Sequence, residues 1–194
     1  LTRGCQRISN RQDLRFIQLK KRRLKDSRLY VVVDQKTACG GNLAQIAEQA
    51  AYGGADIIQL RPLKETPAKE IIRIALEMKA AAKKYGCLFI VNDRPDIAYF
   101  TGADGVHLGQ DDLPVKAARA ILGPHRIIGK SCHSLKQAIQ AEREGVDYIS
   151  IGPIFKTPAK PGYRPVGLKA LKETCQRLNL PIVAIGGINT DNIK

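Results

Sequence analysis

Short apolar runs alternate with amphipathic stretches along the chain from residue 29 onward. The runs are rich in β-branched residues and apolar on both sides, which is typical of parallel strands covered by helices. The stretches between them have helical spacing, as in NLAQIAEQAAYGG and PAKEIIRIALEMKAAAKKYG. The pattern therefore predicts repeated βα units. The expected strands cover residues 29–34, 56–61, 87–93, 104–109, 126–131, 147–152 and 181–187.

Local signals set the expected ends of the helices. Asn42 and Thr66 are predicted N-caps, and Pro67 is placed at a first helical position. Glycines at 53–54, 86 and 145 are predicted to end helices, where the backbone needs a left-handed residue.

One short motif recurs three times and narrows the fold. GADIIQL (54–60), GADGVHL (102–108) and GVDYISI (145–151) each join a helix-ending glycine, a small residue and an aspartate to a strand. Repeated βα units form either an open doubly wound sheet or a closed (β/α)8 barrel. No GxGxxG motif follows the first strand, which disfavours a dinucleotide-binding sheet. Polar residues follow nearly every strand, which favours a TIM barrel with its site at one rim.

The count of strands is one short of a complete barrel. A fourth unit of the repeat is expected about 45 residues after Gly145, close to Lys194, where the sequence given stops. We therefore predict an α/β fold, a (β/α)8 TIM barrel over residues 29–194, with the eighth strand and helix missing from this chain.

The net charge of +14 is concentrated at the start of the chain. Residues 1–28 hold ten Lys and Arg against two Asp, whereas the other 166 residues have 22 Lys and Arg against 16 acids. Clustered cations attract polyanions. The densest run of cations in this segment, LKKRRLK (19–25), contains no aromatic side chain, so stacking on nucleic-acid bases is not favoured. We interpret residues 1–28 as a basic helical or linker extension, and nucleic acid is not an expected partner.

Cysteine usage and hydropathy bear on the compartment. The five cysteines are scattered and form no CxxC pair, which argues against a disulfide framework and a zinc site. No apolar run approaches the ~18 residues of a membrane span. We expect a cytoplasmic protein with reduced thiols that acts on small molecules, and the sequence leaves a homo-oligomer open.

Acidic and amide side chains end two neighbouring predicted strands. Asn92 and Asp93 end the third strand, and Asp111 and Asp112 follow the fourth. Mg²⁺ takes one or two carboxylates together with substrate phosphates and water, so these acids are candidate ligands. The same acids could instead be N-caps of the helices that follow, and spacing alone leaves both interpretations open.

Other strand ends carry anion-binding chemistry. Gln59 and Arg61 alternate to the same side of the second strand, and a guanidinium binds phosphate oxygens bidentately. Ser131 ends the fifth strand in GKSCHS, without the orienting acid of a serine hydrolase. The loop GPIFKTPAKPGYRPVG (152–167) places Thr157 and Lys160 after the sixth strand, and AIGGIN (184–189) follows the seventh. Loops after late strands of such barrels often bind phosphate.

These motifs together closely resemble thiamine phosphate synthase. The resemblance rests on QLR (59–61), VNDR (91–94), GVHLGQDDL (105–113), GKSCHS (129–134), GPIFKTPAKP (152–161) and AIGGIN (184–189), in order from Leu29 onward. It implies a TIM-barrel transferase that condenses a hydroxymethylpyrimidine diphosphate with a thiazole phosphate, releasing pyrophosphate, with Mg²⁺ as cofactor.

The resemblance also implies roles for individual residues. The pyrimidine diphosphate would contact Gln59, Arg61, Asn92, Ser131 and Lys160, of which Arg61, Ser131 and Lys160 are expected to be catalytic. Mg²⁺ would be held by Asp93 and Asp112, with Asp111 as a capping or outer residue. The thiazole phosphate would contact Thr157 and Gly186, with Gly187 beside it.

Three departures from the family pattern are visible. Leu63 stands at the usual lysine position, and Lys64, one residue later, is expected to replace it. Ala159 stands where the family commonly has threonine, and the phosphate contacts of the eighth strand are absent from this chain. The rival interpretations are a thiazole tautomerase-like barrel, and a non-catalytic phosphate- or nucleic-acid-binding protein.

Overall fold

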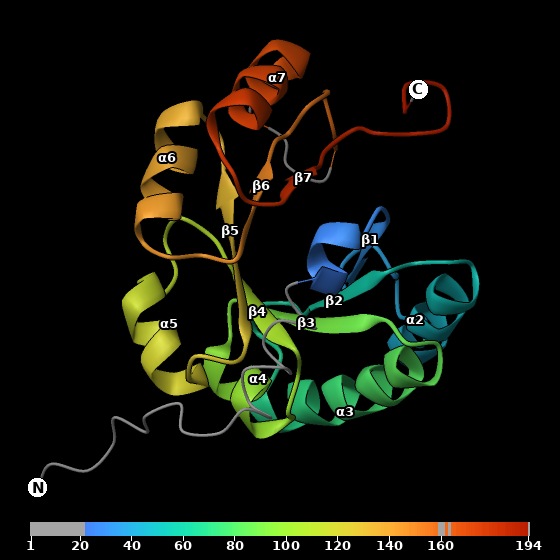
Figure 1. Ribbon diagram of the computed structural model, residues 1–194. Helices are drawn as coiled ribbons and strands as arrows, with labels where there is room; N and C mark the ends of the chain where they lie inside the picture. Colours follow the sequence, from blue (N-terminus) through green and yellow to red (C-terminus); the bar gives the residue numbers. More distant parts are fainter. Residues whose placement is uncertain (1–21, 159–161, 163, 194) are drawn as a thin grey trace, which may run out of the picture.

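Seven parallel strands, neighbours in chain order, form one curved sheet with helices over its outer face (Figure 1). The computed structural model describes residues 22–158, 162 and 164–193. The strands are β1 (Tyr30–Asp34), β2 (Ile57–Arg61), β3 (Leu88–Asn92), β4 (Gly105–Leu108), β5 (Ile127–Cys132), β6 (Tyr148–Ile151) and β7 (Ile182–Ala184). The helices are α2 (Leu43–Tyr52), α3 (Ala68–Lys84), α4 (Pro95–Phe100), α5 (Val115–Leu122), α6 (Leu135–Arg143) and α7 (Gly167–Arg177).

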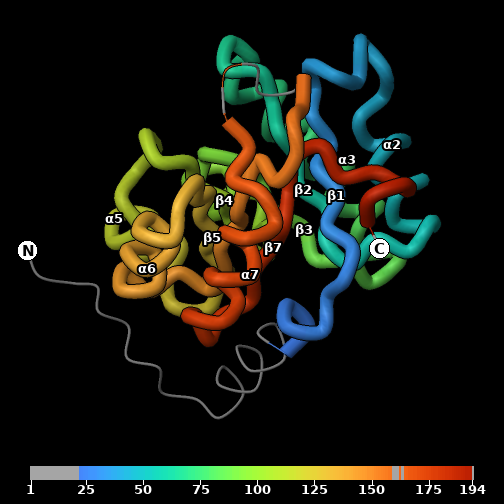
Figure 2. The backbone as a smooth tube through the Cα atoms, turned by 90° about the horizontal axis from the view of Figure 1, so that it is seen from above, coloured from blue at the N-terminus to red at the C-terminus, as the bar shows by residue number. Residues whose placement is uncertain are grey.

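The predicted alternation of strands and helices is confirmed, and the sheet is parallel throughout and TIM-barrel-like. Seen from above, the strands gather at the centre with helices around them (Figure 2). The last strand is shorter than expected because Ile185 and Gly186 bond to the β6 loop. Their carbonyls accept from the N–H groups of Ile154 at 2.8 Å and Phe155 at 2.9 Å. The expected eighth unit stays a prediction.

Alternation along the strands gives the sheet two different faces. The outer face packs on the helices through a large cluster that includes Ile58, Phe89 and Met78. The inner face is apolar near the amino ends of the strands, at Ile57 and Ile127 for example. Toward the carboxyl ends the inner face becomes polar, and this end faces the cavity described below.

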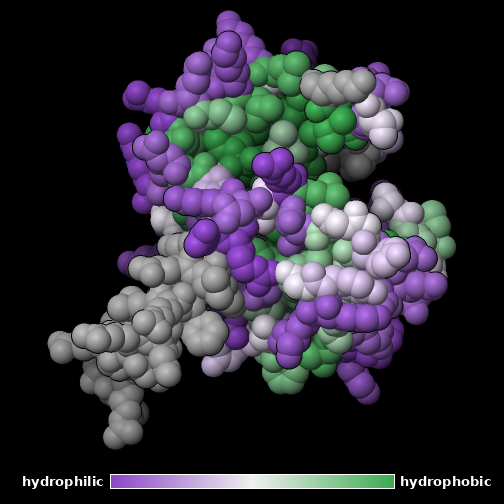
Figure 3. Space-filling model, turned by 45° about the vertical axis from the view of Figure 1, so that its right-hand side comes forward, coloured by the Kyte–Doolittle hydropathy of each residue, from purple (hydrophilic) through white to green (hydrophobic). Residues whose placement is uncertain are grey.

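The first and last strands are less buried than the strands between them. β2, β3, β4 and β6 are almost wholly buried, whereas four of the five β1 residues and all three β7 residues are half-buried. In the part of the chain that the structure describes, each of these two strands pairs on one side only. Apolar surface accordingly gathers in the upper half of Figure 3, the half that holds α7 and β7. The exposed residues around β7 include Leu168, Ile185 and Ile188.

The aspartates of the recurring motif tie neighbouring strands together at the end opposite the cavity. The Asp56 carboxylate accepts from the backbone N–H groups of Arg28 and Leu29, at 2.7 and 2.9 Å. Asp104 accepts from the N–H of Phe89 at 3.0 Å, and Asp147 from that of Ile128 at 2.9 Å. Each motif aspartate therefore satisfies an N–H at the start of the preceding strand, which makes it a structural residue.

The segment before β1 is part of the barrel where it is described. Residues 22–26 are helical, and Leu24, only 4% exposed, packs with Ile57 and Leu88 inside the barrel. Arg23 donates to the carbonyl of Gly86. Residues 22–28 are therefore not a free linker, and the interpretation of residues 1–21 lies outside the described residues.

The helix-end signals are confirmed in part. The Asn42 side chain accepts from two N–H groups at the start of α2, as predicted. Gly54, Gly86 and Gly145 have the expected positive φ. The cap assigned to Thr66 is wrong: α3 starts after Pro67 without a side-chain cap, because the Thr66 hydroxyl donates to Gln35 instead.

Candidate active site

A cavity of about 640 Å³ opens at the carboxyl ends of the strands. Nine of the predicted site residues line it: Gln59, Arg61, Lys64, Asn92, Asp93, Asp112, Ser131, Thr157 and Gly186. Lys160 lies outside the described residues. Gly187 is not among the lining residues. The structure thus brings residues from six strand ends together at one rim, as the barrel interpretation requires.

The two predicted metal ligands lie in contact. The side chains of Asp93 and Asp112 share a hydrogen bond, and Asp112 also accepts from the Gly109 N–H at 2.6 Å. Burial and the facing carboxylate raise the pKa of Asp93 to about 7, although Arg61 and Lys64 oppose this rise. The residue has a positive φ of 61°, which a non-glycine residue rarely adopts. Facing carboxyl groups, one of them with a raised pKa and on a residue of unusual backbone conformation, are typical of a functional site.

The alternative interpretation, in which these acids cap helices, is wrong. Helix α4 begins after Arg94 and α5 after Pro114, and neither cap position makes a side-chain hydrogen bond. At α4 the first helical position is Pro95, which has no N–H that needs a cap, and at α5 the cap position itself is Pro114.

The carboxyl pair has the donor set for a hard cation. The described residues contain no group of three or more His, Cys, Asp and Glu able to hold a metal ion. Mg²⁺ needs only one or two protein carboxylates when phosphates and water complete its shell. The pKa of Asp93 is raised because the carboxyl group is buried and faces Asp112. A cation bound between the two carboxylates would relieve their mutual repulsion. Asp93 and Asp112 therefore fit a magnesium ion whose other ligands are water and an anionic substrate.

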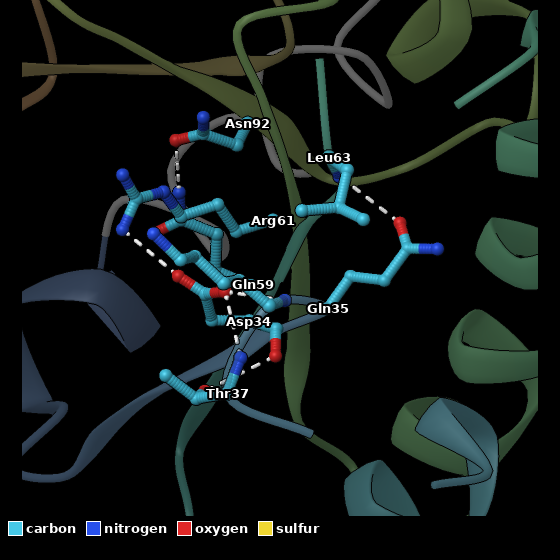
Figure 4. Close-up of polar contacts among 8 residues, drawn as sticks. Asp34, Gln35, Thr37, Gln59, Arg61, Leu63 and Asn92 are labelled. Carbon is cyan, nitrogen blue, oxygen red and sulfur yellow. Dashed lines mark hydrogen bonds and ion pairs between the residues drawn. The ribbon is translucent and has the colours of Figure 1, made fainter. Parts of the chain in front are cut away.

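Cations and amides surround the carboxyl pair. Arg61 Nη1 donates to Asp34 Oδ2 at 2.9 Å (Figure 4). Lys64 lines the cavity whereas Leu63 does not, so the lysine one residue later occupies the mouth. The Gln59 amide donates to Asn92 Oδ1 at 2.5 Å. The mouth thus presents fixed donors beside fixed acceptors.

A continuous chain of hydrogen bonds runs through the barrel interior beneath the mouth. The Tyr30 hydroxyl donates to Gln59 Oε1 at 3.0 Å and lies 2.8 Å from the Tyr148 hydroxyl. The Tyr148 hydroxyl in turn lies 2.8 Å from Nδ1 of His107, whose Nε2 lies 2.9 Å from Ser131 Oγ. These hydrogen bonds join five strands and leave their members almost fully paired, as buried polar groups require.

Counting protons gives this chain a direction. Tyr30 gives its proton to Gln59, so the Tyr148 hydroxyl must donate to Tyr30 and accept from His107. That assigns the proton of His107 to Nδ1 and leaves Nε2 to accept from Ser131. Burial raises the pKa of both tyrosines, so their hydroxyls keep their protons at neutral pH.

The same arrangement excludes a serine hydrolase. Ser131 does contact a histidine, but the partner is His107 rather than His133, which bonds to the Gly152 carbonyl at 2.5 Å. Nδ1 of His107 faces a tyrosine hydroxyl, where a hydrolase triad has a carboxylate that stabilises the imidazolium. Ser131 is therefore a hydrogen-bonding residue of the cavity, as predicted.

Four cavity residues escaped the sequence analysis: Tyr30, His107, Tyr148 and Ser150. All four lie inside strands, where aromatic and small residues are ordinary, and His107 and Ser150 are each only 6% exposed. None of the four shares a strand with Gln59 or Ser131, so alternation along those strands does not reach them, and only the register between strands places them in the cavity.

The two late loops approach each other through glycines. A Cβ on Gly186 would lie 2.5 Å from Pro153, and one on Gly187 would lie 2.6 Å from the Lys156 carbonyl oxygen. Both have a positive φ. The structure therefore gives these glycines a packing reason, and the predicted contact with phosphate is a separate matter that stays a prediction. Gly186 and Thr157 line the cavity, and the phosphate contact expected of Gly187 stays a prediction.

Comparisons with known proteins point to one family. The family model described as thiamine monophosphate synthase matches residues 29–194. Curated thiamine-phosphate synthases from Coprothermobacter proteolyticus and Chloroflexus aurantiacus are 46% and 45% identical. The matches cover 90% and 86% of this chain, and 82% and 77% of those proteins. A thiamine-phosphate synthase from Gloeobacter violaceus is 44% identical, and this chain spans only 49% of its length.

Solved structures agree with the sequence comparisons. Thiamine phosphate pyrophosphorylase from Pyrococcus furiosus has a TM-score of 0.78 and 38% identity, and the match covers 87% of this chain and 79% of that one. N-acetylmannosamine-6-phosphate 2-epimerase from Clostridium perfringens has a TM-score of 0.65 at 17% identity, with 97% and 85% covered. The second likeness shows the fold alone.

Proposed function

The chain belongs to the thiamine monophosphate synthase family, a family of transferases of thiamine biosynthesis, and from this premise we propose its reaction. The proposed substrates are 4-amino-2-methyl-5-hydroxymethylpyrimidine diphosphate and a thiazole phosphate, and the products are thiamine phosphate and pyrophosphate. One observation carries the proposal. The carboxyl pair Asp93 and Asp112 shares a single cavity with the cations of Arg61 and Lys64.

The reaction needs no protein nucleophile. Pyrophosphate leaves from the carbon that joins it to the pyrimidine ring, the electron-rich aminopyrimidine stabilises the resulting cation, and the thiazole nitrogen attacks that carbon. The protein must therefore stabilise the leaving group and align the two partners. A cavity lined by preorganised donors is suited to both tasks.

Each part of the cavity has a proposed role. Arg61, Lys64 and Lys160 bind the diphosphate oxygens, and Asn92, Gln59 and Ser131 orient the pyrimidine diphosphate. Asp93 and Asp112 would hold Mg²⁺, which would supply positive charge to the leaving diphosphate when bound. Thr157, Gly186 and Gly187 bind the thiazole phosphate.

The interior hydrogen-bond chain supports this proposal as a positioning device. It fixes the Gln59 amide from below through Tyr30, and the Ser131 hydroxyl through His107. Buried and mutually bonded side chains cannot turn freely, so the groups that face the substrate are preorganised. Preorganised donors cost little reorganisation during the reaction.

The test is to incubate the full chain with both precursors and Mg²⁺ and to identify products by mass spectrometry. Thiamine phosphate should form only when both precursors and Mg²⁺ are present. Isomerised thiazole phosphate without condensation would favour a tautomerase-like barrel instead. The cytoplasmic location stays a prediction, and a homo-oligomer stays open.

A further inference from the structure

The carboxylate of Asp34, at the end of β1, is held rigidly on one side. Its Oδ1 accepts from the backbone N–H groups of Lys36 at 2.8 Å and Thr37 at 3.3 Å. The Thr37 hydroxyl closes the turn by donating to the Asp34 carbonyl at 3.1 Å (Figure 4). Side-chain to backbone bonds of this kind fix an aspartate in a turn. The second carboxylate oxygen is thereby aimed at the mouth of the barrel.

That second oxygen holds Arg61. The distance from Arg61 Nη1 to Asp34 Oδ2 is 2.9 Å, with the two side chains 38% and 16% exposed. A guanidinium has five N–H donors, so this contact leaves others for an anion. The pair holds the guanidinium on Asp34 of β1, although Arg61 also interacts electrostatically with Asp93.

The next residue, Gln35, holds the loop that carries the second cation. Its Oε1 accepts from the Leu63 N–H at 3.0 Å and from the Thr66 hydroxyl at 2.9 Å. These two partners flank Lys64, which lines the cavity. The backbone N–H of Gln35 also donates to the carbonyl of Arg61 at 2.9 Å, joining β1 to the start of the loop.

We propose that Asp34 and Gln35 are positioning residues of the anion-binding site: Asp34 orients the Arg61 guanidinium, and Gln35 orients the loop that presents Lys64. The inference rests on the proposed function, in which Arg61 and Lys64 bind the diphosphate. It accounts for the shift of the lysine by one residue, because the anchor at Gln35 sets which side chain of the loop faces the mouth.

The opposite effect of Asp34 also has to be weighed. A carboxylate near the site repels a diphosphate, so its removal could strengthen binding. The repulsion is small, since the negative charge is already paired with Arg61 and partly screened by water. Releasing the guanidinium frees a rotamer-rich side chain and allows it to turn toward Asp93. Positioning therefore outweighs repulsion, and removing the charge should weaken anion binding.

The experiment compares Asp34→Asn with the wild type in the full chain. Asparagine keeps the acceptor that the turn needs and loses the charge that holds Arg61. We expect affinity for inorganic pyrophosphate, measured calorimetrically with Mg²⁺, to fall about tenfold, the lower end for a partly exposed charged hydrogen bond. The KM for the pyrimidine diphosphate should rise similarly, with a smaller change in the KM for the thiazole phosphate. Thr37→Val, which alters the same turn without touching the ion pair, should bind pyrophosphate as the wild type does.

Double mutants test whether Asp34 acts through Arg61 and Gln35 through Lys64. In an Arg61→Ala background, Asp34→Asn should cause no further loss of pyrophosphate affinity, because the guanidinium that it orients is gone and only its repulsion of the anion remains. Gln35→Met should likewise weaken binding in the wild type and not in Lys64→Ala. Unchanged or tighter binding in Asp34→Asn, or an equal loss with and without Arg61, would overturn the positioning role.

The outcomes also separate this inference from the proposed function. A wild-type chain that makes thiamine phosphate, together with an uncoupled Asp34→Asn, defeats only the positioning role. A wild type that binds no pyrophosphate and forms no product defeats both.

Discussion

The carboxyl pair at the mouth should make the metal-free protein less stable as pH rises, and Asp93→Asn should remove this effect. The pKa of Asp93 is raised from its ordinary 3.8 to about 7, first by burial and then by Asp112. The folded protein therefore binds this proton more tightly than the unfolded chain does. The free energy of unfolding contributed by this group falls as pH rises from about 4 to about 7, and changes no further above that.

The size of the effect follows from the two pKa values. Full conversion of the difference gives about 4 kcal/mol, at ~1.4 kcal/mol for each pH unit between them. The side chain is only half-buried, so solvent screening reduces this to about 2 kcal/mol. Asparagine is the suitable substitution, since it has no charge and tolerates the positive φ at this position.

The assay is urea unfolding of the wild type and Asp93→Asn at pH 4.5 and pH 8, both with a chelator. The two proteins should have similar stability at pH 4.5, and the variant should be about 2 kcal/mol more stable at pH 8. Glu48→Gln is the matched control, because Lys84 lowers the pKa of Glu48 and the stability tied to that group changes mainly below pH 4.5, so its difference from the wild type should be nearly the same at both pH values. The reasoning is refuted if the difference between wild type and Asp93→Asn does not change with pH.

Further predictions concern the metal and the barrel interior. Mg²⁺ binding at pH 6 should release roughly one proton from the pair of Asp93 and Asp112, seen as a buffer-dependent enthalpy in calorimetry, and no buffer dependence would contradict the site. Tyr148→Phe removes the hydrogen bonds to the Tyr30 hydroxyl and to His107 Nδ1 and should cost about 1–3 kcal/mol in urea unfolding, whereas an unchanged midpoint would count against the hydrogen-bond chain. Gly129→Ala would place a Cβ 2.1 Å from the ring of Tyr148 and should lower the free energy of unfolding by about 1–3 kcal/mol, and an unchanged melting temperature would contradict this. Leu24→Ala should cost about 2–3 kcal/mol by urea unfolding, and a neutral result would mean that residues 22–28 do not stabilise the barrel.

Much of the fold could be predicted because apolar runs separated by helical spacing fit only a few parallel architectures. The strand bounds agree to within a residue or two except at β7, where the end of the expected strand bonds to a loop. Such a contact lies far apart in sequence and leaves no local pattern. The Thr66 cap failed for a similar reason, since its hydroxyl has a tertiary partner in Gln35.

The rim of the site was predictable where polar residues interrupt strand ends. Gln59, Arg61 and Asp93 break apolar runs, so position alone marks them. Tyr30 and Tyr148 were missed because an aromatic residue in a buried strand resembles ordinary core. Their role depends on hydroxyl partners from other strands, and only three-dimensional register brings these together.

The most direct test of the account is the stoichiometry of the reaction. With both precursors, Mg²⁺ and the full chain, thiamine phosphate and pyrophosphate should appear in equal amounts, and Asp93→Asn at saturating Mg²⁺ should reduce the rate by about 10²-fold or more. Absence of thiamine phosphate from a folded wild-type protein, or near-normal turnover in Asp93→Asn, would contradict the account.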